Sequence, residues 1–348
     1  MNVSARFMRT KSTLMLTVGP WQAVLGSALV RQLKLSAESV DMLLLSADAD
    51  APIVGPTRRI HELNEFKDFF LKIYARLGEE RALGTGYDLI LVPGFGGREV
   101  FATAMQFFSS KTRVIIYEDG LHAICDDFFY GRLQAMWRSN FTLRLQEFIR
   151  IALKREWSWF TARSRLVGEG RFLDVDSKSF APSIRLSEEL VRDQLDLLGY
   201  DKGVPFGEGR NVLVLGTNFS AYGLLRPEEE YRPVYEYIES LGDGVTCWWK
   251  PHPRADRLYS ELLSFKYPNV RQFPEGLSAY PIEAFVGNMN LVEIASFHSS
   301  ALLYSHRLYG IPPRVIGEPV EVLQKLPTKD FYYTAVYMEK CIKKWMSQ

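Results

Sequence analysis

Short apolar runs that end in glycine, proline or serine alternate with longer helical patterns along this chain. Strands buried on both faces read as continuous apolar runs, so the alternation is typical of βα units around a parallel sheet. In the first half the pattern predicts strands over residues 13–18, 42–46, 88–92 and 113–117. It also predicts a helix from Pro20 towards Leu33 and another over residues 61–77.

The same rhythm restarts after a polar, glycine-rich stretch at residues 199–210. It predicts strands over 211–215, 245–249, 269–273, 291–295 and 314–316, a helix near 228–241 and a terminal helix over 330–345. The 348 residues are too many for one doubly wound domain. We therefore expect an α/β protein with two Rossmann-type parallel-sheet domains, residues 1–205 and 206–327, facing a central cleft. A terminal helix, 328–348, is expected to pack back on the first domain.

Composition narrows the class of protein. The 42 Lys and Arg residues balance 41 Asp and Glu residues, so net charge gives no indication of a nucleic-acid partner. Three cysteines without a CxxC pair fit a reducing compartment. The chain has no uninterrupted apolar stretch of about 18 residues, the length that spans a bilayer. These features predict a cytoplasmic protein.

Two motifs that follow predicted strands carry candidate chemistry. Glu118-Asp119-Gly120 comes directly after the strand at 113–117, at the carboxyl end where open α/β sheets bind ligands. Acids at such a place can equally cap a helix or a turn. Lys250-Pro251-His252-Pro253 follows the strand at 245–249, and the two prolines hold the imidazole on a stiff backbone. A histidine in a rigid surface turn would have the same sequence.

A third motif, Ser299-Ser300, follows the run at 291–295 and begins a helical pattern. Serine hydroxyls and free amides at a helix start form an anion site, although an ordinary N-cap serine reads the same way. Asn218, Tyr222 and Arg254 also follow predicted strand ends.

In this order the three motifs resemble those of bacterial sialyltransferases, in particular the polysialyltransferase and lipooligosaccharide sialyltransferase families. The resemblance extends from Glu118 to Ser300 and rests on short motifs. It implies a GT-B-like fold with an acceptor-side first domain and a CMP-sugar-binding second domain. It also implies inverting transfer of sialic acid from CMP-sialic acid to a glycan hydroxyl of a capsule or lipooligosaccharide, without a metal or other cofactor.

The resemblance assigns roles to particular residues. Glu118 or Asp119 would be the general base, and His252 would protonate or hydrogen-bond the leaving phosphate. Ser299 and Ser300 would hold that phosphate, and Glu283 would lie near the nucleotide ribose. Gly120, Lys250 and Pro253 complete the substrate-binding set. Leu121-His122, where small or polar residues are expected, leaves the acceptor open.

Other interpretations remain open. The donor can be another CMP-activated keto acid, such as Kdo, legionaminic acid or pseudaminic acid, because the proposed groups face parts that these donors share. A non-catalytic glycan-binding assembly subunit would keep the fold without the chemistry. Asp48-Ala49-Asp50, Gly94-Phe95-Gly96-Gly97, and His122 with Asp126 and Asp127 match a metal or dinucleotide motif less well.

Basic and aromatic residues are interleaved between residues 132 and 165, and the terminal helix carries Lys340, Lys343, Lys344 and Trp345. Such stretches can lie on an anionic membrane surface, bind an acidic glycan, or be amphipathic helices whose aromatic face is buried. Peripheral membrane association is therefore one expectation for an enzyme that extends lipid-linked glycans.

Overall fold

The computed structural model describes residues 12–17, 19–44, 58–62, 87–94, 111–118, 165–173, 181–198, 206, 209–252, 263–326 and 330–347. The chain divides into two compact units, residues 1–198 and 199–348. This division lies a few residues before the predicted boundary at 205/206, and the terminal helix belongs to the second unit.

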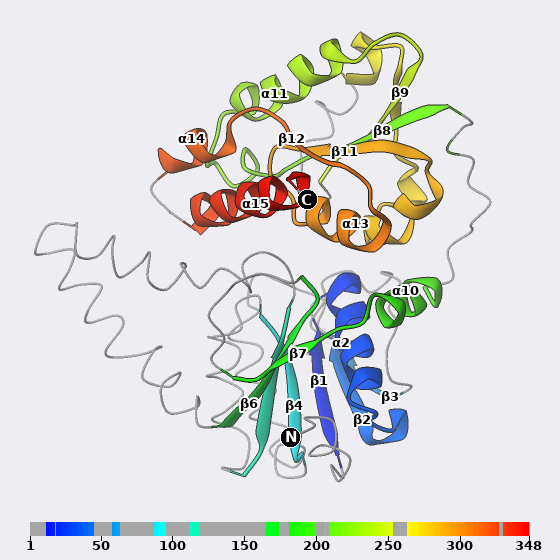
Figure 1. Ribbon diagram of the computed structural model, residues 1–348, viewed down its shortest axis with the longest axis vertical. Coiled ribbons are helices and arrows are strands. Elements are labelled where there is room, and N and C mark those ends of the chain that lie inside the picture. The colour runs from blue at the N-terminus through cyan, green and yellow to red at the C-terminus, as the bar shows by residue number, and fades with distance from the viewer. Residues whose placement is uncertain are drawn as a thin grey trace, which may run out of the picture. The chain divides into compact units, whose positions relative to one another are not determined.

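The first unit contains a seven-stranded sheet with the order β3-β2-β1-β4-β5-β6-β7 (Figure 1). The strands are β1 (Thr13–Thr17), β2 (Val40–Leu44), β3 (Arg58–Glu62), β4 (Leu89–Pro93), β5 (Arg113–Tyr117), β6 (Leu166–Arg171) and β7 (Ser183–Arg185). Every pair is parallel. The strand order reverses between β1 and β4, which is the place where doubly wound sheets bind ligands at their carboxyl edge.

Two helices of the first unit are α2 (Pro20–Gln32) and α10 (Glu188–Asp196). Pro20 occupies the first turn of α2, where its missing N–H costs no helical hydrogen bond. Gly26 lets α2 approach the sheet closely, since a Cβ there would lie 2.6 Å from Met15 Sδ and 3.2 Å from Tyr117 Cζ. The buried Tyr117 hydroxyl donates to the Leu16 carbonyl at 2.5 Å and so links β5 to β1.

The second unit is built on a five-stranded parallel sheet with the order β10-β9-β8-β11-β12. Its strands are β8 (Arg210–Leu215), β9 (Val245–Lys250), β10 (Val270–Gln272), β11 (Leu291–Ser296) and β12 (Pro313–Val315). The chain runs outward from β8 to β10 and then returns to the other side of β8. The order therefore reverses between β8 and β11, and β8 is the central strand.

Helices α11 (Pro227–Ser240), α13 (Ala301–Tyr309), α14 (Pro319–Gln324) and α15 (Asp330–Met346) complete the second unit. Figure 1 shows α11 and α13 on opposite sides of the sheet. Val212 and Val214 of β8 share one buried cluster with Tyr231, Val234 and Ile238 of α11. Alternate residues of one strand thus face one helical layer, as the two-residue repeat of a strand requires.

The terminal helix α15 packs within the second unit through its described contacts. Ala335 belongs to the same buried cluster as β8 and α11, and the Trp345 ring stacks on His306 of α13 with centroids 4.9 Å apart. Contact of this helix with the first unit stays a prediction. Among the described residues, no helix is long and apolar enough to cross a membrane.

Every strand predicted from the apolar runs is confirmed, as are the helices that begin at Pro20, near Glu228 and at Asp330. The start of the predicted helix at 61–77 is wrong, because residues 61 and 62 end β3; residues 63–77 lie outside the described part of the chain. Strands β3, β6 and β7 and helix α10 were not predicted. Strand β3 reads Arg-Arg-Ile-His-Glu and β6 reads Leu-Val-Gly-Glu-Gly-Arg, so neither shows the apolar run of an inner strand.

Candidate active site

Three neighbouring strands of the second sheet bring two of the sequence motifs to one edge. Because β9, β8 and β11 are parallel and adjacent, the segments that leave their carboxyl ends begin side by side. His252 follows β9, and Ser299 and Ser300 follow β11. The segment that leaves β8 begins between them. The predicted histidine and the predicted anion-binding serines therefore share the ligand-binding edge of this sheet.

Lys250, the first residue of the Lys250-Pro251-His252-Pro253 motif, is buried at the end of β9. Its Nζ donates to the Ser278 carbonyl at 3.3 Å and lies 5.6 Å from the centre of the Phe273 ring. Burial lowers the pKa of Lys250, and the nearby carboxylate of Glu283 opposes that shift. Lys250, two residues before His252 in the sequence, thus directs its amine towards Ser278 and Phe273.

Glu283 lies in a short 3₁₀ turn, Ile282–Ala284, and is buried. Burial raises its pKa to about 7, while a hydrogen bond from its own backbone amide and the charge of Lys250 pull the pKa down. The Glu283 carbonyl accepts a hydrogen bond from the Tyr309 hydroxyl of α13 at 3.0 Å. The structure therefore brings Lys250 and Glu283 together, two residues that the sequence separates widely.

Ser299 and Ser300 form the start of α13. The Ala301 amide donates to Ser299 Oγ at 3.3 Å, and Ser300 is the residue that precedes the first helical turn. Capping by Ser299 is thus observed, and it is compatible with an anion site because a helix N-terminus presents further amides. Both serines are partly exposed.

A histidine that the sequence analysis did not single out lies next to these serines. His298 Nε2 is 2.8 Å from Thr334 Oγ1 of α15, and Thr334 donates its own hydroxyl proton to the Phe331 carbonyl at 2.9 Å. The ring also meets Phe219 and Phe331 edge to face, at 5.7 and 6.0 Å. Helix α15 thereby fixes the backbone just before Ser299.

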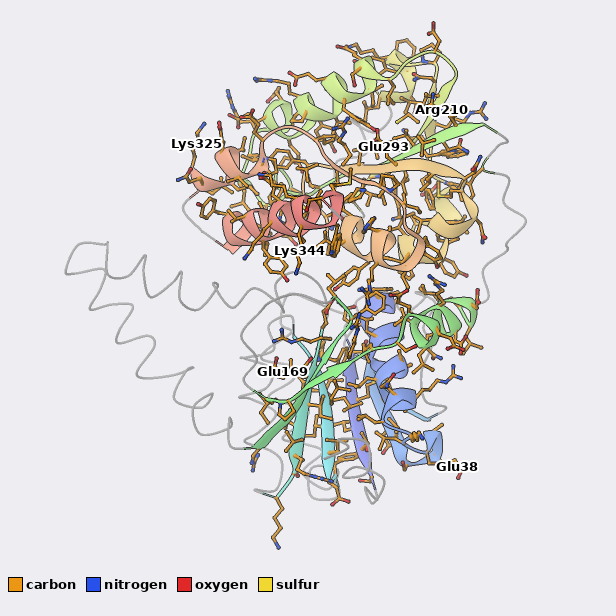
Figure 2. The ribbon with its side chains drawn as sticks, in the orientation of Figure 1. Glu38, Glu169, Arg210, Glu293, Lys325 and Lys344 are labelled. Carbon is orange, nitrogen blue, oxygen red and sulfur yellow. The ribbon has the colours of Figure 1, made fainter. Side chains whose placement is uncertain are left out.

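In the first unit, Glu118 lies at the exit of β5 and is only 2% exposed. Its Oε2 accepts hydrogen bonds from the amides of Phe172 at 2.9 Å and Leu173 at 3.0 Å, which follow β6. Its own amide donates to the Gly170 carbonyl at 2.9 Å. The carboxylate therefore ties the exits of two neighbouring strands together. On β6 itself, Glu169 (labelled in Figure 2) forms an ion pair with Arg171 at 2.6 Å.

Several predicted residues lie outside the described part of the chain: Asp119, Gly120, Pro253, Arg254, the stretch 121–164, and the motifs at 48–50 and 95–97. Gly94 is described, and its amide donates to the Tyr117 carbonyl at 2.8 Å. Within the described ranges no three His, Cys, Asp or Glu side chains gather as a metal-ligand set. The absence of a metal requirement stays a prediction.

Gly216 and Glu230 also lie at the ligand-binding edge of the second sheet, and no sequence motif predicts them. Glu230 belongs to a run of three glutamates in the first turn of α11, a pattern typical of a solvated helix start. It is nevertheless buried, and it accepts hydrogen bonds from the Thr217 hydroxyl, the Phe219 amide at 3.0 Å and the Ser220 amide at 2.7 Å. No sequence signal distinguishes Glu230 from Glu228 and Glu229.

Comparison with solved structures identifies the class of fold. The GT-B domain of a sialyltransferase from Photobacterium damselae superposes with a TM-score of 0.52 at 12% identity, over 94% of this chain and 97% of that one. The UDP-GlcNAc 2-epimerase of Neisseria meningitidis gives 0.56 at 12% identity, over 94% and 91%. The S. aureus MnaA–UDP complex gives 0.56 at 11% identity, over 93% and 87%. The chain therefore has the GT-B fold of two parallel-sheet α/β domains.

The particular family follows from the sequence match. Residues 98–316, well over half of the chain, match the family described as alpha-2,8-polysialyltransferase (POLYST). A search of curated protein sequences finds no significant match. The chain belongs to the alpha-2,8-polysialyltransferase family, and it is a glycosyltransferase of the sialyltransferase type. The matched segment includes all three motifs, from Glu118 to Ser300.

Proposed function

We propose that this protein transfers sialic acid from CMP-sialic acid to a hydroxyl group of a bacterial surface glycan, with inversion at the anomeric carbon and without a metal ion. The name of its family specifies an α2,8-linked polymer, and a sialic-acid-terminated acceptor is accordingly the first one to test.

One observation carries the proposal. The adjacent exits of β9, β8 and β11 gather His252, Ser299 and Ser300 at one edge of the second sheet, within the segment that matches the family. An imidazole and a helix N-terminus at one site suit a departing phosphate, because both stabilise negative charge. A scaffold that only held a glycan would not require this pair.

In the proposed reaction the acceptor oxygen forms a bond to the anomeric carbon of sialic acid as the bond from that carbon to the CMP phosphate oxygen breaks. The acceptor hydroxyl gives its proton to a carboxylate of the Glu118-Asp119 pair. A positioned general base contributes about a hundredfold to ten-thousandfold. Attack opposite the leaving phosphate inverts the configuration.

The leaving group is the phosphate of CMP, a monoester, which takes the electron pair of the broken bond. We assign to His252 the proton or hydrogen bond that this oxygen receives. Ser300 and the first amides of α13 would hold the other phosphate oxygens, with Ser299 fixing the helix start. Glu283, buried beside Lys250, would form the wall nearest the ribose.

The assay that tests the proposal combines purified protein, a sialic-acid-terminated oligosaccharide and a panel of CMP-activated donors, in buffer that contains EDTA. We expect CMP-sialic acid to be consumed, the acceptor mass to increase by one sialic acid at a time, and NMR of the product to show inversion. Turnover of CMP-Kdo or another keto-acid donor alone would assign a different donor. Binding of the glycan with no donor cleaved would overturn the proposal in favour of a glycan-binding subunit.

Attachment to an anionic membrane is part of the same proposal. Helix α15 exposes Lys340, Lys343 and Lys344 within two turns, although Lys343 also pairs with Glu339 at 3.3 Å. A basic helical face is attracted to anionic lipid by about 1 kcal/mol per residue near the surface. We expect the protein to sediment with vesicles that contain phosphatidylglycerol and less so after Lys340→Glu with Lys344→Glu. Equal recovery with neutral vesicles would contradict this attachment.

A further inference from the structure

The segment that leaves the central strand β8, residues 216–220, is here called the β8 exit loop. It begins between the exits of β9 and β11, because β8 pairs with both strands. The loop therefore separates the two parts of the proposed phosphate site, His252 on one side and the Ser299-Ser300 pair on the other.

Towards β9, Gly216 makes the closest approach. Its amide donates to the Lys250 carbonyl at 2.9 Å. A Cβ at residue 216 would lie 3.1 Å from the backbone nitrogen of His252 and 2.9 Å from Cη2 of Trp249, distances shorter than ordinary van der Waals contact. Residue 216 must therefore be small for lack of space. The backbone at Gly216 thus lies against the backbone from Lys250 to His252.

Towards β11, the contact runs through the last residue of the strand. Ser296 Oγ donates to the Leu215 carbonyl at 3.0 Å and accepts from the His298 amide at 3.3 Å. Phe219 of the loop meets the rings of Phe297 and His298 edge to face, at 6.0 and 5.7 Å. The end of β8 and the loop are thus in contact with the backbone that leads into Ser299.

The β8 exit loop is itself held from a third direction. Glu230 of α11 accepts the hydroxyl of Thr217 and the amides of Phe219 and Ser220. Hydrogen bonds to a buried carboxylate are stronger than those between neutral groups. Hydrogen bonds therefore hold the loop on both sides of a group added at Gly216: one to the Lys250 carbonyl, and three to Glu230. We therefore expect a methyl group at residue 216 to displace Trp249 and His252 more than the loop itself.

From these contacts we propose that the β8 exit loop positions His252 relative to the Ser299-Ser300 pair, and that Gly216 is the positioning residue through which it acts on His252. The inference rests on the proposed function for the role of His252. It adds a requirement that the three motifs do not contain: a small residue at 216 and an acidic anchor at 230.

The test separates the two neighbours that a methyl group at residue 216 would meet. Gly216→Ala is compared with Trp249→Phe, which removes the outer edge of the indole, and with the double variant, in which the added methyl still faces the His252 nitrogen. Each variant is characterised by its thermal midpoint, by kcat and KM for CMP-sialic acid, and by the pH profile of kcat. If Gly216→Ala alone does not fold, the double variant and its parent Trp249→Phe carry the comparison.

We expect kcat of the double variant to be at least tenfold below that of Trp249→Phe, with KM changed less than threefold and the pH-profile limb of the leaving-group acid displaced. Recovery of kcat to within twofold of Trp249→Phe would assign the whole effect to the Trp249 clash and overturn the proposal.

A readout independent of turnover distinguishes this inference from the proposed function. In protein labelled with ¹⁵N-histidine, the His252 imidazole resonances are assigned by their loss in His252→Ala. We expect them to move in Gly216→Ala and in the double variant, and to remain in place in Trp249→Phe. Unchanged His252 resonances would overturn the positioning role, whether or not the wild-type protein cleaves any donor.

Discussion

Two buried carboxylates, Glu118 in the first unit and Glu230 in the second, make nearly the same contacts for different expected purposes. Each accepts two consecutive backbone amides at a strand exit: Glu118 those of Phe172 and Leu173, and Glu230 those of Phe219 and Ser220. Glu118 belongs to the acidic motif that the family resemblance associates with proton transfer. Glu230 comes from a helix and belongs to no motif.

The two units differ in whether the carboxylate that anchors the backbone is also a candidate for the chemical step. In the second unit Glu230 anchors the β8 exit loop, while His252 and the serines remain separate groups at the edge of the sheet. In the first unit, one oxygen of the candidate base is already bound to two amides. A carboxylate held in this way is accurately placed, and its neighbour Asp119 is the other candidate for the proton transfer.

The largest expected effect is on the rate of CMP release, which should distinguish Glu118 from Glu230. Glu118→Gln and Asp119→Asn are measured beside Glu230→Gln for CMP release. We expect the residue that serves as base to lose about a hundredfold to ten-thousandfold in kcat, because the amide cannot take the acceptor proton. Glu230→Gln should lose far less, since it contacts the site only through the loop. Equal losses for Glu118→Gln and Glu230→Gln, with Asp119→Asn more damaged than both, would reduce Glu118 to an anchor.

The next effect concerns stability. Glu230→Ala leaves the hydroxyl of Thr217, the buried amide of Phe219 and the partly buried amide of Ser220 without their acceptor, and each buried donor left unpaired costs about 1–3 kcal/mol. We expect the free energy of unfolding to fall by about 4 kcal/mol in urea denaturation. The matched control is Glu228→Ala on the same helical turn, whose side chain is exposed and whose loss should stay within about 0.5 kcal/mol. Equal losses would show that Glu230 anchors nothing.

Another buried carboxylate, Glu283, should make the stability of the protein depend on pH. Burial raises its pKa from 4.5 to about 7. The folded protein then binds this proton more tightly than the unfolded chain does, so the stabilising contribution is complete below about pH 4.5 and is lost as pH rises through about 7. At about 1.4 kcal/mol per pKa unit, the loss is on the order of 3 kcal/mol.

Glu283→Gln should remove this dependence. We expect the difference in unfolding free energy between wild type and Glu283→Gln to change by that amount between pH 4.5 and 7.5 and to be flat above it. A difference that is constant with pH would mean that Glu283 titrates as an ordinary carboxyl.

The smallest expected effect distinguishes the two serines. Ser299→Ala removes the acceptor of the Ala301 amide and should cost about 1 kcal/mol of stability, as loss of a helix cap does. Ser300→Ala should leave stability nearly unchanged and raise KM for the CMP donor several-fold if its hydroxyl binds phosphate. Thermal midpoints and donor titrations of the two variants check this; a larger stability loss for Ser300→Ala would reverse the assignment.

The sequence predicted the inner strands of both sheets except β6, because residues buried on both faces form unbroken apolar runs, as in Leu89–Pro93 and residues 212–215. It did not predict β6, in which Gly168, Glu169 and Gly170 interrupt the apolar run. It also predicted that the His-Pro and Ser-Ser motifs follow strands, and the parallel topology then brings them to one edge. It did not predict β3 or β7, which lie at the sheet edges, where charged and polar residues are tolerated.

The supporting contacts were beyond sequence patterns for a physical reason. Glu230 reads as one of three solvated glutamates, and only the path of the loop after β8 buries it. In the sequence, Gly216 is an ordinary glycine at the end of a strand. Only the structure shows that a Cβ there would lie 3.1 Å from the backbone nitrogen of His252. His298 lies beside Ser299 in sequence, but its partner Thr334 is on the last helix. Contacts between distant segments leave no local pattern.

In the proposed reaction, the edge of the second sheet supplies the group that assists departure of CMP. The most direct test of this role is the steady-state rate of CMP release from CMP-sialic acid by wild type and His252→Ala, with thermal midpoints measured on the same samples. We expect the variant to keep its thermal midpoint within a few degrees and to lose at least a hundredfold in rate. A variant that folds and releases CMP as fast as wild type would contradict the account.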